Sequence, residues 1–283
     1  MTPRTRQIFI GVLIFLVVGL LVAVIISWAV LSTEHYDRWV KPGDEYKVGA
    51  RVYRMPDLPI RMSHQKTGRK DQKILILSEA FMEEERDLMI RATTLLDELK
   101  IDYWLSGGTL IGFSGVFGTF IPWDDDIDVH STWANREYLF SRKFATDAAR
   151  HDLEVIQLPE STLHHATKEA AAVRLRRKGK DLPVCDIFFE KEMEDGRWAK
   201  VDSWFGDSLS FNKREQWNAD DLFPLVHKEV DGMRLSFPNK PENLLKAQYG
   251  STVKEEMVYT DPMLSHQFPY RFLFAFWKVR KPE

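Results

Sequence analysis

The longest apolar stretch of the chain lies close to its beginning. From Ile8 to Leu31 the sequence IFIGVLIFLVVGLLVAVIISWAVL contains no charged residue. At 1.5 Å per residue, about 24 helical residues extend about 36 Å, enough to cross the hydrocarbon core of a bilayer with some tilt. The apolar part of a cleaved signal peptide is shorter, about 7–15 residues. A buried core helix is the alternative, but such helices seldom lack charge on every side at this length. The pattern predicts a signal anchor over residues 8–31.

Charged residues on the two sides of this run predict its orientation. Arg4 and Arg6 precede it, and Arg38, Lys41 and Lys47 follow it. Positive residues close to a membrane span tend to stay in the cytoplasm, although the bias here is small. We therefore expect a short cytoplasmic tail over residues 1–7 and a single-pass type II arrangement, with the rest of the chain on the other side of the membrane.

The hydrophobic pattern changes twice after the apolar run. Residues 32–72 contain several prolines and many charges without a clear period, which is typical of a stem. From residue 73 to residue 283 the pattern predicts a globular domain. Its first element is a helix over about 79–100, because Phe81, Leu88 and Leu95 belong to one apolar stripe and Ser78 is a suitable N-cap.

Alternating or continuous apolar segments in the rest of this domain predict strands. The segments are DYWL, DIDVH, LEVIQL, AAVRLRR and VCDIFFE, and NREYLFSRKFATDAAR between them has a helical pattern. A strand-rich sheet with flanking helices places the domain in the mixed α/β (α+β) class.

Composition excludes several kinds of protein. Hydrophobic residues make up 44% and charged residues 29% of the 283 residues, which suits a packed domain. The net charge of −3 argues against a nucleic-acid-binding protein, which normally has a basic face. The single cysteine, Cys185, excludes an intramolecular disulfide and a zinc site made of several cysteines.

The stretch FIPWDDDIDV, residues 120–129, concentrates negative charge beside large apolar side chains. Asp126 and Asp128 are two residues apart, so on a strand they share one face while Ile127 and Val129 face the core. Asp186, in VCDIFFE, is another acid on an apolar strand, which could lie beside the first. Three carboxylates from two strands would suit Mg²⁺ or Mn²⁺ and leave positions open for phosphate oxygens.

Other residues are candidates for binding phosphate. Gly107 and Gly108 let backbone amides approach an anion, and a helix beginning near Thr109 would direct its N-terminus there. Arg174 and Arg176 share a strand face and could bind a diphosphate, although an exposed strand edge is an equal alternative.

The stretch GGTLIGFSGVFGTFIPWDDDIDV closely resembles the signature of the LicD-type family, which includes fukutin and fukutin-related protein. CDIFFE resembles the second acidic strand of the family, and LFPLVHKEVDGMRLSFPNKPENLLKAQYGSTV resembles its C-terminal part. The resemblance covers roughly residues 90–255. It implies a nucleotidyltransferase-like fold, with Asp126, Asp128 and Asp186 as the metal-binding acids and Gly107, Gly108 and Thr109 at the phosphate side.

The resemblance also implies an activity. Members of the family move a phospho-alditol, phosphocholine or similar group from a CDP-linked donor to a glycan, so we expect a membrane-anchored, metal-dependent phosphotransferase. If the source is eukaryotic, the domain is expected in the Golgi lumen. A non-catalytic scaffold with the same fold and a true nucleotidyltransferase remain alternatives. The transferred group, the acceptor glycan, the catalytic base and the oligomeric state do not follow from the sequence.

Overall fold

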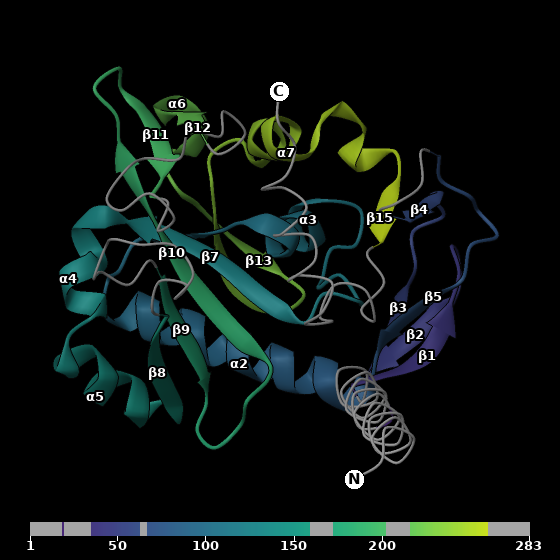
Figure 1. Cartoon of the computed structure of the whole chain (residues 1–283), viewed down its shortest axis with the longest axis horizontal. Helices are drawn as coiled ribbons and strands as arrows, with labels where there is room; N and C mark the ends of the chain where they lie inside the picture. Colours follow the sequence, from purple (N-terminus) through teal and green to yellow (C-terminus); the bar gives the residue numbers. More distant parts are fainter. Residues whose placement is uncertain (1–18, 20–34, 63–66, 159–171, 202–215, 260–283) are drawn as a thin grey trace, which may run out of the picture.

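The computed structural model describes residue 19 and residues 35–62, 67–158, 172–201 and 216–259 (Figure 1). Within this part of the chain, no helix is long and apolar enough to cross a membrane. The anchor predicted over residues 8–31 lies outside the described residues, apart from Gly19.

A mixed seven-stranded sheet forms the centre of the molecule. Five strands follow one another in the order β12-β11-β10-β7-β6, and β9 pairs with β10 while β8 pairs with β9. The strands β7 and β10 are parallel, whereas the other neighbours are antiparallel. Their bounds are β6 Tyr103–Leu105, β7 Asp126–Thr132, β8 Leu153–Leu158, β9 Ala172–Arg177, β10 Val184–Glu192, β11 Arg197–Lys200 and β12 Gln216–Asn218. The sheet with its flanking helices confirms the predicted mixed α/β class.

Helices flank this sheet (Figure 1). The longest, α2, begins after Ser78, whose hydroxyl accepts a hydrogen bond from the amide of Phe81 at 3.2 Å, as the sequence predicts. The helix predicted over 135–150 is instead two helices, because Ser141 caps a new one after Phe140. The helices are α2 Glu79–Glu98, α3 Gly107–Ser114, α4 Arg136–Leu139, α5 Arg142–Arg150, α6 Ala219–Leu222 and α7 Pro241–Tyr249, with 3₁₀ turns at Trp133–Asn135 and Ser251–Lys254.

The main hydrophobic core lies between the sheet and α2. Leu88, Leu96, Ile127 and Ile187 are fully buried in it. Alternation along β7 directs Ile127 and Val129 into this core, so the strand's aspartates occupy the opposite face. The core therefore fixes the direction in which the acidic side chains project.

A second hydrophobic cluster joins the N-terminal strands to the first turns of α2. Tyr36, Val40, Ile74, Phe81 and Met82 belong to it. The interpretation of residues 32–72 as a stem is wrong for much of this stretch, which forms strands packed on the domain. These strands and their partners are β1 Tyr36–Val40, β2 Glu45–Val48, β3 Arg51–Arg54, β4 Ile60–Met62, β5 Ile74–Leu77 and β15 Met257–Tyr259. Short strands of three to five residues give too few alternating positions to reveal a period.

The hairpin β13 (Val226–Val230) and β14 (Met233–Phe237) is tied to the N-terminal strands through its turn. The carboxylate of Asp231 accepts hydrogen bonds from Arg86 at 2.6 Å, Arg51 at 3.1 Å, Tyr53 at 2.9 Å and Thr119 at 3.0 Å. One largely buried carboxylate thus connects four segments that are distant in sequence.

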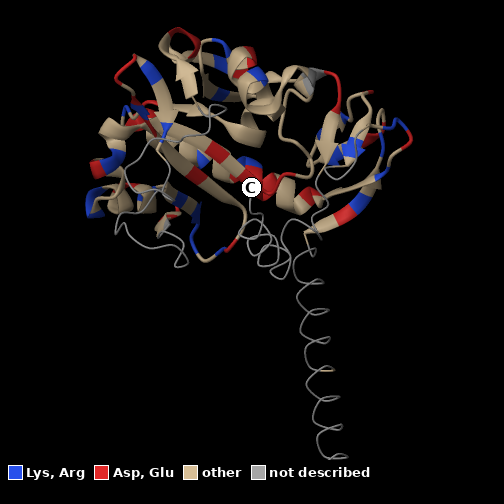
Figure 2. Ribbon diagram, turned by 45° about the horizontal axis from the view of Figure 1, so that its top comes forward, with Lys and Arg blue, Asp and Glu red and all other residues tan. Residues whose placement is uncertain are grey.

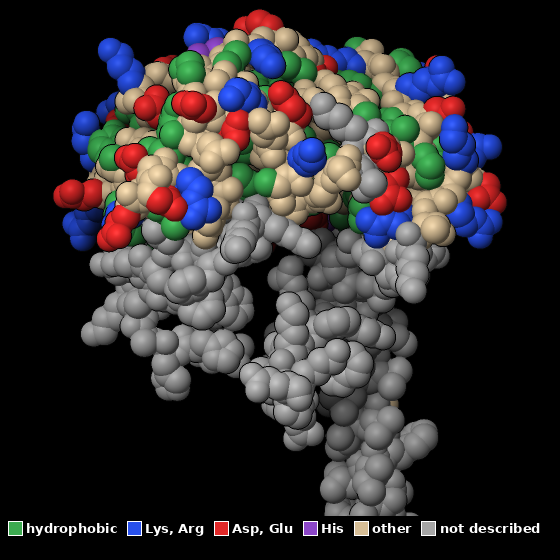
Figure 3. Space-filling view, turned by 90° about the horizontal axis from the view of Figure 1, so that it is seen from above, with side chains coloured by type: hydrophobic (Ala, Val, Ile, Leu, Met, Phe, Trp, Pro, Cys, Tyr) green, Lys and Arg blue, Asp and Glu red, His purple; other side chains and the backbone are tan. Residues whose placement is uncertain are grey.

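Charges on the described surface are mixed. On the face shown in Figure 3, acidic and basic side chains alternate without a large area of one sign.

Candidate active site

The three predicted acids occupy two adjacent strands. In the parallel pair of β7 and β10, Asp128 lies directly opposite Asp186, and Asp126 lies opposite Val184. The sequence interpretation that Asp186 could lie beside the β7 acids is therefore confirmed by the register. Figure 2 shows acidic positions gathered near the middle of the molecule.

A glycine turn approaches these acids from α3. Gly107 has φ +56°, and a Cβ atom built there would overlap the carboxylate of Asp128. A Cβ atom on Gly108 would overlap the carboxylate of Asp124. Two glycines are thus required for the first turn of α3 to lie against two carboxylates, which brings the backbone amides of the helix N-terminus to the acidic site.

Hydrogen bonds hold α3 to β7. The amide of Asp128 donates to the hydroxyl of Thr109 at 2.9 Å, and the amide of Ser106 donates to the carbonyl of Asp128 at 3.1 Å. The side chain of Thr109 is 3% exposed, so its hydroxyl positions the strand that carries the acids. A direct phosphate contact by Thr109 stays a prediction.

The carboxylates repel one another. Burial, followed by the charges of Asp126 and Asp186, raises the pKa of Asp128 from 3.8 to about 8, although Lys200 and Arg174 oppose the rise. Burial and the charges of Asp126, Asp128 and Asp125 also raise the pKa of Asp124 well above its ordinary value. The site therefore attracts a positive charge or a proton.

Arg174 neutralises part of this charge. Its Nε and terminal nitrogen each donate to an oxygen of Asp186 at 2.7 Å, forming a bidentate pair across β9 and β10. Arg176 instead pairs with Glu154 at 3.0 Å and Asp181 at 2.7 Å. The two arginines share a strand face as predicted, but only Arg174 contacts a predicted site residue. Their binding of a diphosphate stays a prediction.

Sequence reasoning missed Glu85, which is fully buried on α2. Several acids stand at the start of α2, but Glu85 lies in the buried stripe that also contains Met82 and Met89. Neither carboxylate oxygen has a hydrogen-bond partner among the described residues. Burial and the charges of Asp124, Asp126 and Asp125 raise its pKa well above the ordinary value. The spacing of three and four residues from buried methionines was the signal that could have identified it.

The chemistry of these side chains fits a divalent cation. Carboxylate oxygens are the ligands that Mg²⁺ and Mn²⁺ prefer, and buried carboxylates with raised pKa values lack a compensating charge. In the described part of the chain, no three acidic, histidine or cysteine side chains are grouped closely enough to hold a metal ion as they stand. Asp126, Asp128 and Asp186 would therefore have to turn toward a common point to bind one.

The tryptophan of the acidic motif is part of the protein wall. The ring of Trp123 packs edge-on against Phe117 and Tyr259, with centroid distances of 5.5 and 5.7 Å. Its carbonyl accepts a hydrogen bond from Tyr36 at 3.3 Å, and the carbonyl of Pro122 accepts one from Leu77 at 2.8 Å. These contacts fix the turn that precedes Asp124.

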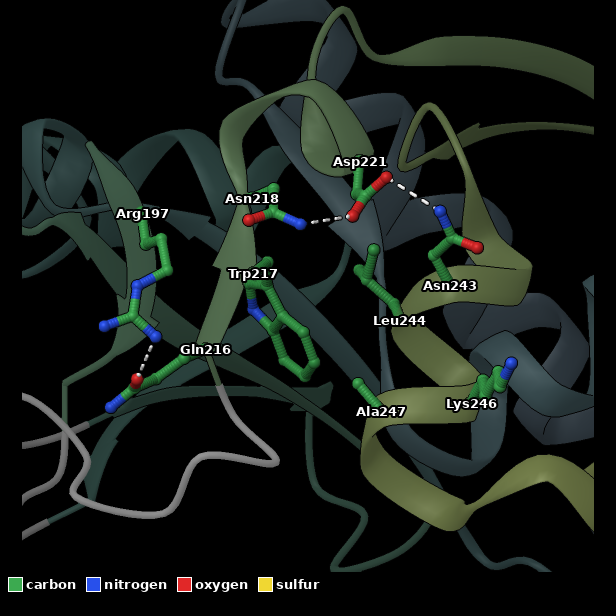
Figure 4. A pocket seen from close by; sticks show the side chains of 9 residues that line it. All are labelled: Arg197, Gln216, Trp217, Asn218, Asp221, Asn243, Leu244, Lys246 and Ala247. Atoms are coloured by element: carbon green, nitrogen blue, oxygen red, sulfur yellow. Dashed lines mark hydrogen bonds between the residues drawn. The ribbon is translucent and has the colours of Figure 1, made fainter. Parts of the chain in front are cut away.

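A cavity of about 470 Å³ lies apart from the acids, between β11, β12, α6 and α7 (Figure 4). Asp221 accepts hydrogen bonds from Asn218 at 3.0 Å and Asn243 at 2.8 Å, and Arg197 donates to Gln216 at 2.9 Å. These polar groups already hold the surrounding elements together. The lining residues are Arg197, Gln216, Trp217, Asn218, Asp221, Asn243, Leu244, Lys246 and Ala247, and none was predicted from sequence.

A buried polar network connects the wall of this cavity to β7. Glu190 accepts a hydrogen bond from the indole of Trp217 at 2.8 Å and lies 2.5 Å from Nδ1 of His130. All three side chains are buried. The network fixes β12 relative to the strand that carries the acids.

Part of the chain is similar in sequence to known proteins. Two curated relatives, named ribitol-5-phosphate transferase FKTN, from Macaca fascicularis and Homo sapiens, are each 25% identical over 181 residues. The match covers 62% of this chain and 34% of each relative, so the chain spans about a third of their length. A crystal structure of the lincosamide antibiotic adenylyltransferase LnuA with lincomycin bound has 15% identity, covering 57% of this chain and 84% of that one. Its TM-score of 0.33 is too low to assign a shared fold.

Residues 100–240 match the family described as LicD/FKTN/FKRP, nucleotidyltransferase domain. The matched region contains the glycine turn, both β7 aspartates, Asp186 and the two strand arginines. The identity of the curated relatives, although low, points in the same direction. Residues 100–240 of this chain therefore belong to the LicD/FKTN/FKRP family.

Proposed function

We propose that the chain is a divalent-metal-dependent phosphotransferase that moves a phospho-alditol or phosphocholine-type group from a CDP-linked donor to a glycan. The observation that carries this proposal is the placement of Asp128 opposite Asp186, with the first turn of α3 packed against the carboxylate of Asp128. The family of residues 100–240 and the name of the two relatives support the same reaction class.

Carboxylates, backbone amides and one arginine have different roles in the proposed site. Asp126, Asp128 and Asp186 would hold Mg²⁺ or Mn²⁺, which when bound neutralises the donor diphosphate. The amides at Gly107 and Gly108 lie where an anion gains from the helix N-terminus. Arg174, whose side chain is 32% exposed beside Asp186, is available to a phosphate oxygen at the edge of the site.

The reaction is a single displacement at phosphorus. The acceptor hydroxyl oxygen forms a bond to the phosphorus that bears the alditol or choline, and the bridging bond from that phosphorus to CMP breaks. The hydroxyl proton passes to a carboxylate of the site, and CMP leaves with the bridging oxygen. Asp128 is the candidate for this base among the β7 acids, since its raised pKa favours accepting a proton.

The test is CMP release by the full chain in detergent. CDP-ribitol, CDP-glycerol and CDP-choline are each supplied with a panel of oligosaccharides and Mg²⁺ or Mn²⁺. Asp126→Asn and Asp128→Asn should each reduce turnover by at least about 100-fold, as loss of charge stabilisation at a reacting phosphate commonly does. The matched control is Asp102→Asn, an exposed aspartate just before β6. Full turnover in both β7 variants would exclude the assignment.

Nucleotidyl transfer is a second candidate, because the matching family is described as a nucleotidyltransferase domain. The same residues would serve it, but pyrophosphate rather than CMP would leave when a nucleoside triphosphate is the donor. Release of pyrophosphate from CTP, without CMP from any CDP-linked donor, would favour this function. Binding of neither metal nor cytidine nucleotide by the folded chain would favour a non-catalytic scaffold.

We also propose that residues 8–31 anchor the chain as a type II membrane protein, with the catalytic domain in the lumen of the Golgi if the source is eukaryotic. The uncharged apolar run and the preceding Arg4 and Arg6 support this placement. Protease added to sealed microsomes should leave the domain intact. Digestion of the domain in intact vesicles would reverse the proposed topology.

A further inference from the structure

Trp39 is the most exposed large apolar side chain in the described part of the molecule. It is 63% exposed, whereas Tyr36 and Val40 on the same strand are 8% and 2% exposed. Strand β1 thus has an inner face that packs on the second hydrophobic cluster and an outer face that displays an indole ring. An exposed tryptophan on an otherwise well-packed strand indicates a contact outside the domain.

The register of β1 and β5 places further side chains around Trp39. Trp39 lies opposite Leu75, which is partly exposed between the fully buried Ile74 and Ile76. Side chains directly opposite in an antiparallel pair share a face. Trp39 and Leu75 therefore lie side by side on the outer face of this two-stranded sheet, where Leu75 also packs in part against the second hydrophobic cluster.

Lysines extend the same face. Continuing the alternation along each strand by two residues leads to Lys41 after Trp39 and Lys73 before Leu75, and both are exposed. We call Trp39, Leu75, Lys41 and Lys73 the Trp39 patch. This combination is typical of a bilayer surface. There, aromatic rings such as indole lie at the level of the headgroups, and lysines attract anionic lipids.

The length of the chain limits how far this patch can be from the apolar run. Only residues 32–35 separate Leu31 from the start of β1 at Tyr36. Five residues fully extended reach at most about 18 Å, and eight residues, as far as Trp39, reach at most about 29 Å. The headgroup region on one side of a bilayer is about 5–8 Å thick. If residues 8–31 cross a membrane, β1 begins close to its surface.

The outer face of β1 is available for that contact. Its inner side chains contribute to the second hydrophobic cluster, and one edge of its backbone is paired with β5. Figure 1 shows β1, β2, β3 and β5 together at one side of the molecule, away from β8 to β12. A contact there leaves the central sheet and its acids uncovered.

We propose that the Trp39 patch lies in the headgroup region of the same bilayer that holds residues 8–31, with Trp39 inserted and the two lysines against anionic lipids. The proposal rests on the membrane anchor of the proposed function. This contact between the bilayer and strands β1 and β5 would set the orientation of the catalytic domain, which a freely moving stem would not do.

The test uses the buried position of the single cysteine, Cys185, because a new exposed cysteine can then be labelled selectively. Asp37→Cys, on β1 and exposed, receives an NBD fluorophore while Trp39 stays in place. Ile90→Cys, 42% exposed on α2, is the matched control. The full chain is reconstituted in vesicles of phosphatidylcholine with one fifth phosphatidylserine, with and without doxyl-labelled lipid.

We expect quenching of the label at position 37 to exceed that at position 90 by at least about twofold, since doxyl groups quench over molecular contact distances and the patch lies at headgroup depth. Trp39→Ala should reduce that quenching, and Lys41→Glu with Lys73→Glu should reduce it only when phosphatidylserine is present. Equal quenching at the two positions would overturn the proposal.

The anchor and the patch can be separated in the same vesicles. Alkaline carbonate could leave the chain in the membrane while the label at position 37 is quenched no more than the label at position 90. In that case the proposed contact of the Trp39 patch with the bilayer is wrong, and the anchor proposed for residues 8–31 is retained. If carbonate releases the chain, the anchor proposed for residues 8–31 is wrong, and the patch proposal is overturned with it.

Discussion

Replacing Asp128 with asparagine should stabilise the metal-free protein. Burial beside Asp126 and Asp186 raises the pKa of Asp128 to about 8, whereas in the unfolded chain it returns toward 3.8. At pH 7 the carboxyl group of Asp128 is therefore ionised in the unfolded chain but largely protonated in the folded chain, and this difference favours unfolding. The difference between 3.8 and 7 is about 3 pH units, which corresponds to about 4 kcal/mol at 1.4 kcal/mol per unit. Solvent reaching the partly exposed carboxyl reduces this to about 2 kcal/mol.

The sign follows from proton binding. Because the folded pKa is above the unfolded one, the folded state holds the extra proton between pH 4 and pH 8, and its stability falls as pH rises through that window. The stability of Asp128→Asn does not fall in this way, because asparagine does not titrate. The gain in unfolding free energy over the wild-type protein should therefore be near zero at pH 4, grow with pH and level off above pH 8.

Urea unfolding of the full chain in detergent, with EDTA and at four pH values from 4 to 8.5, measures this difference. Adding Mg²⁺ at pH 7.5 should raise the stability of the wild-type protein and leave Asp128→Asn unchanged. Asp102→Asn is the matched control, which should follow the wild-type curve. A difference that does not change with pH, or a variant less stable at every pH, would refute the electrostatic reasoning.

Three further changes test other parts of the structure. Gly108→Ala should strongly reduce CMP release with circular dichroism unchanged, because the added methyl group displaces the carboxylate of Asp124; wild-type turnover would contradict this packing. Asp231→Ala should lower the unfolding free energy by about 3 kcal/mol in urea, since two arginines, a tyrosine and a threonine lose their shared acceptor. Glu85→Gln should raise the unfolding free energy by about 1 kcal/mol at pH 7 but not at pH 4, because glutamine avoids the cost of ionising a buried carboxyl group with a raised pKa. Glu83→Gln, on the exposed side of α2, is the control. A Glu85→Gln variant that is less stable than the wild-type protein would mean that the carboxyl group has a stabilising partner.

Long, regular patterns made part of the fold predictable. The apolar stripe of α2 runs over five turns, and the aspartates of β7 alternate with buried aliphatic residues, so both elements were identifiable with their faces. Asp186 was found for the same reason, because an acid interrupting an apolar strand needs a partner or a cation. The register that sets it opposite Asp128 required the structure.

Features that depend on tertiary contacts were not predictable. Each of the N-terminal strands is too short to show a period, and they are ordered by packing on the first turns of α2. Glu85 resembles the other acids of a helix start, and its burial arises from elements that are distant in sequence. The pairing of Arg174 with Asp186 likewise depends on β9 lying beside β10, which two separate strand patterns cannot specify.

The central claim is metal-dependent transfer of a phosphate-linked group at the β7 acids, and ³¹P NMR of one reaction tests it most directly. The full chain, CDP-ribitol, Mg²⁺ and the oligosaccharide panel are followed in time, beside the same mixture with EDTA and with Asp126→Asn. The account predicts that the diphosphate signals disappear while CMP and a phosphodiester appear in equal amounts, and only in the wild-type sample with Mg²⁺. Conversion that proceeds equally in EDTA or with Asp126→Asn would contradict it.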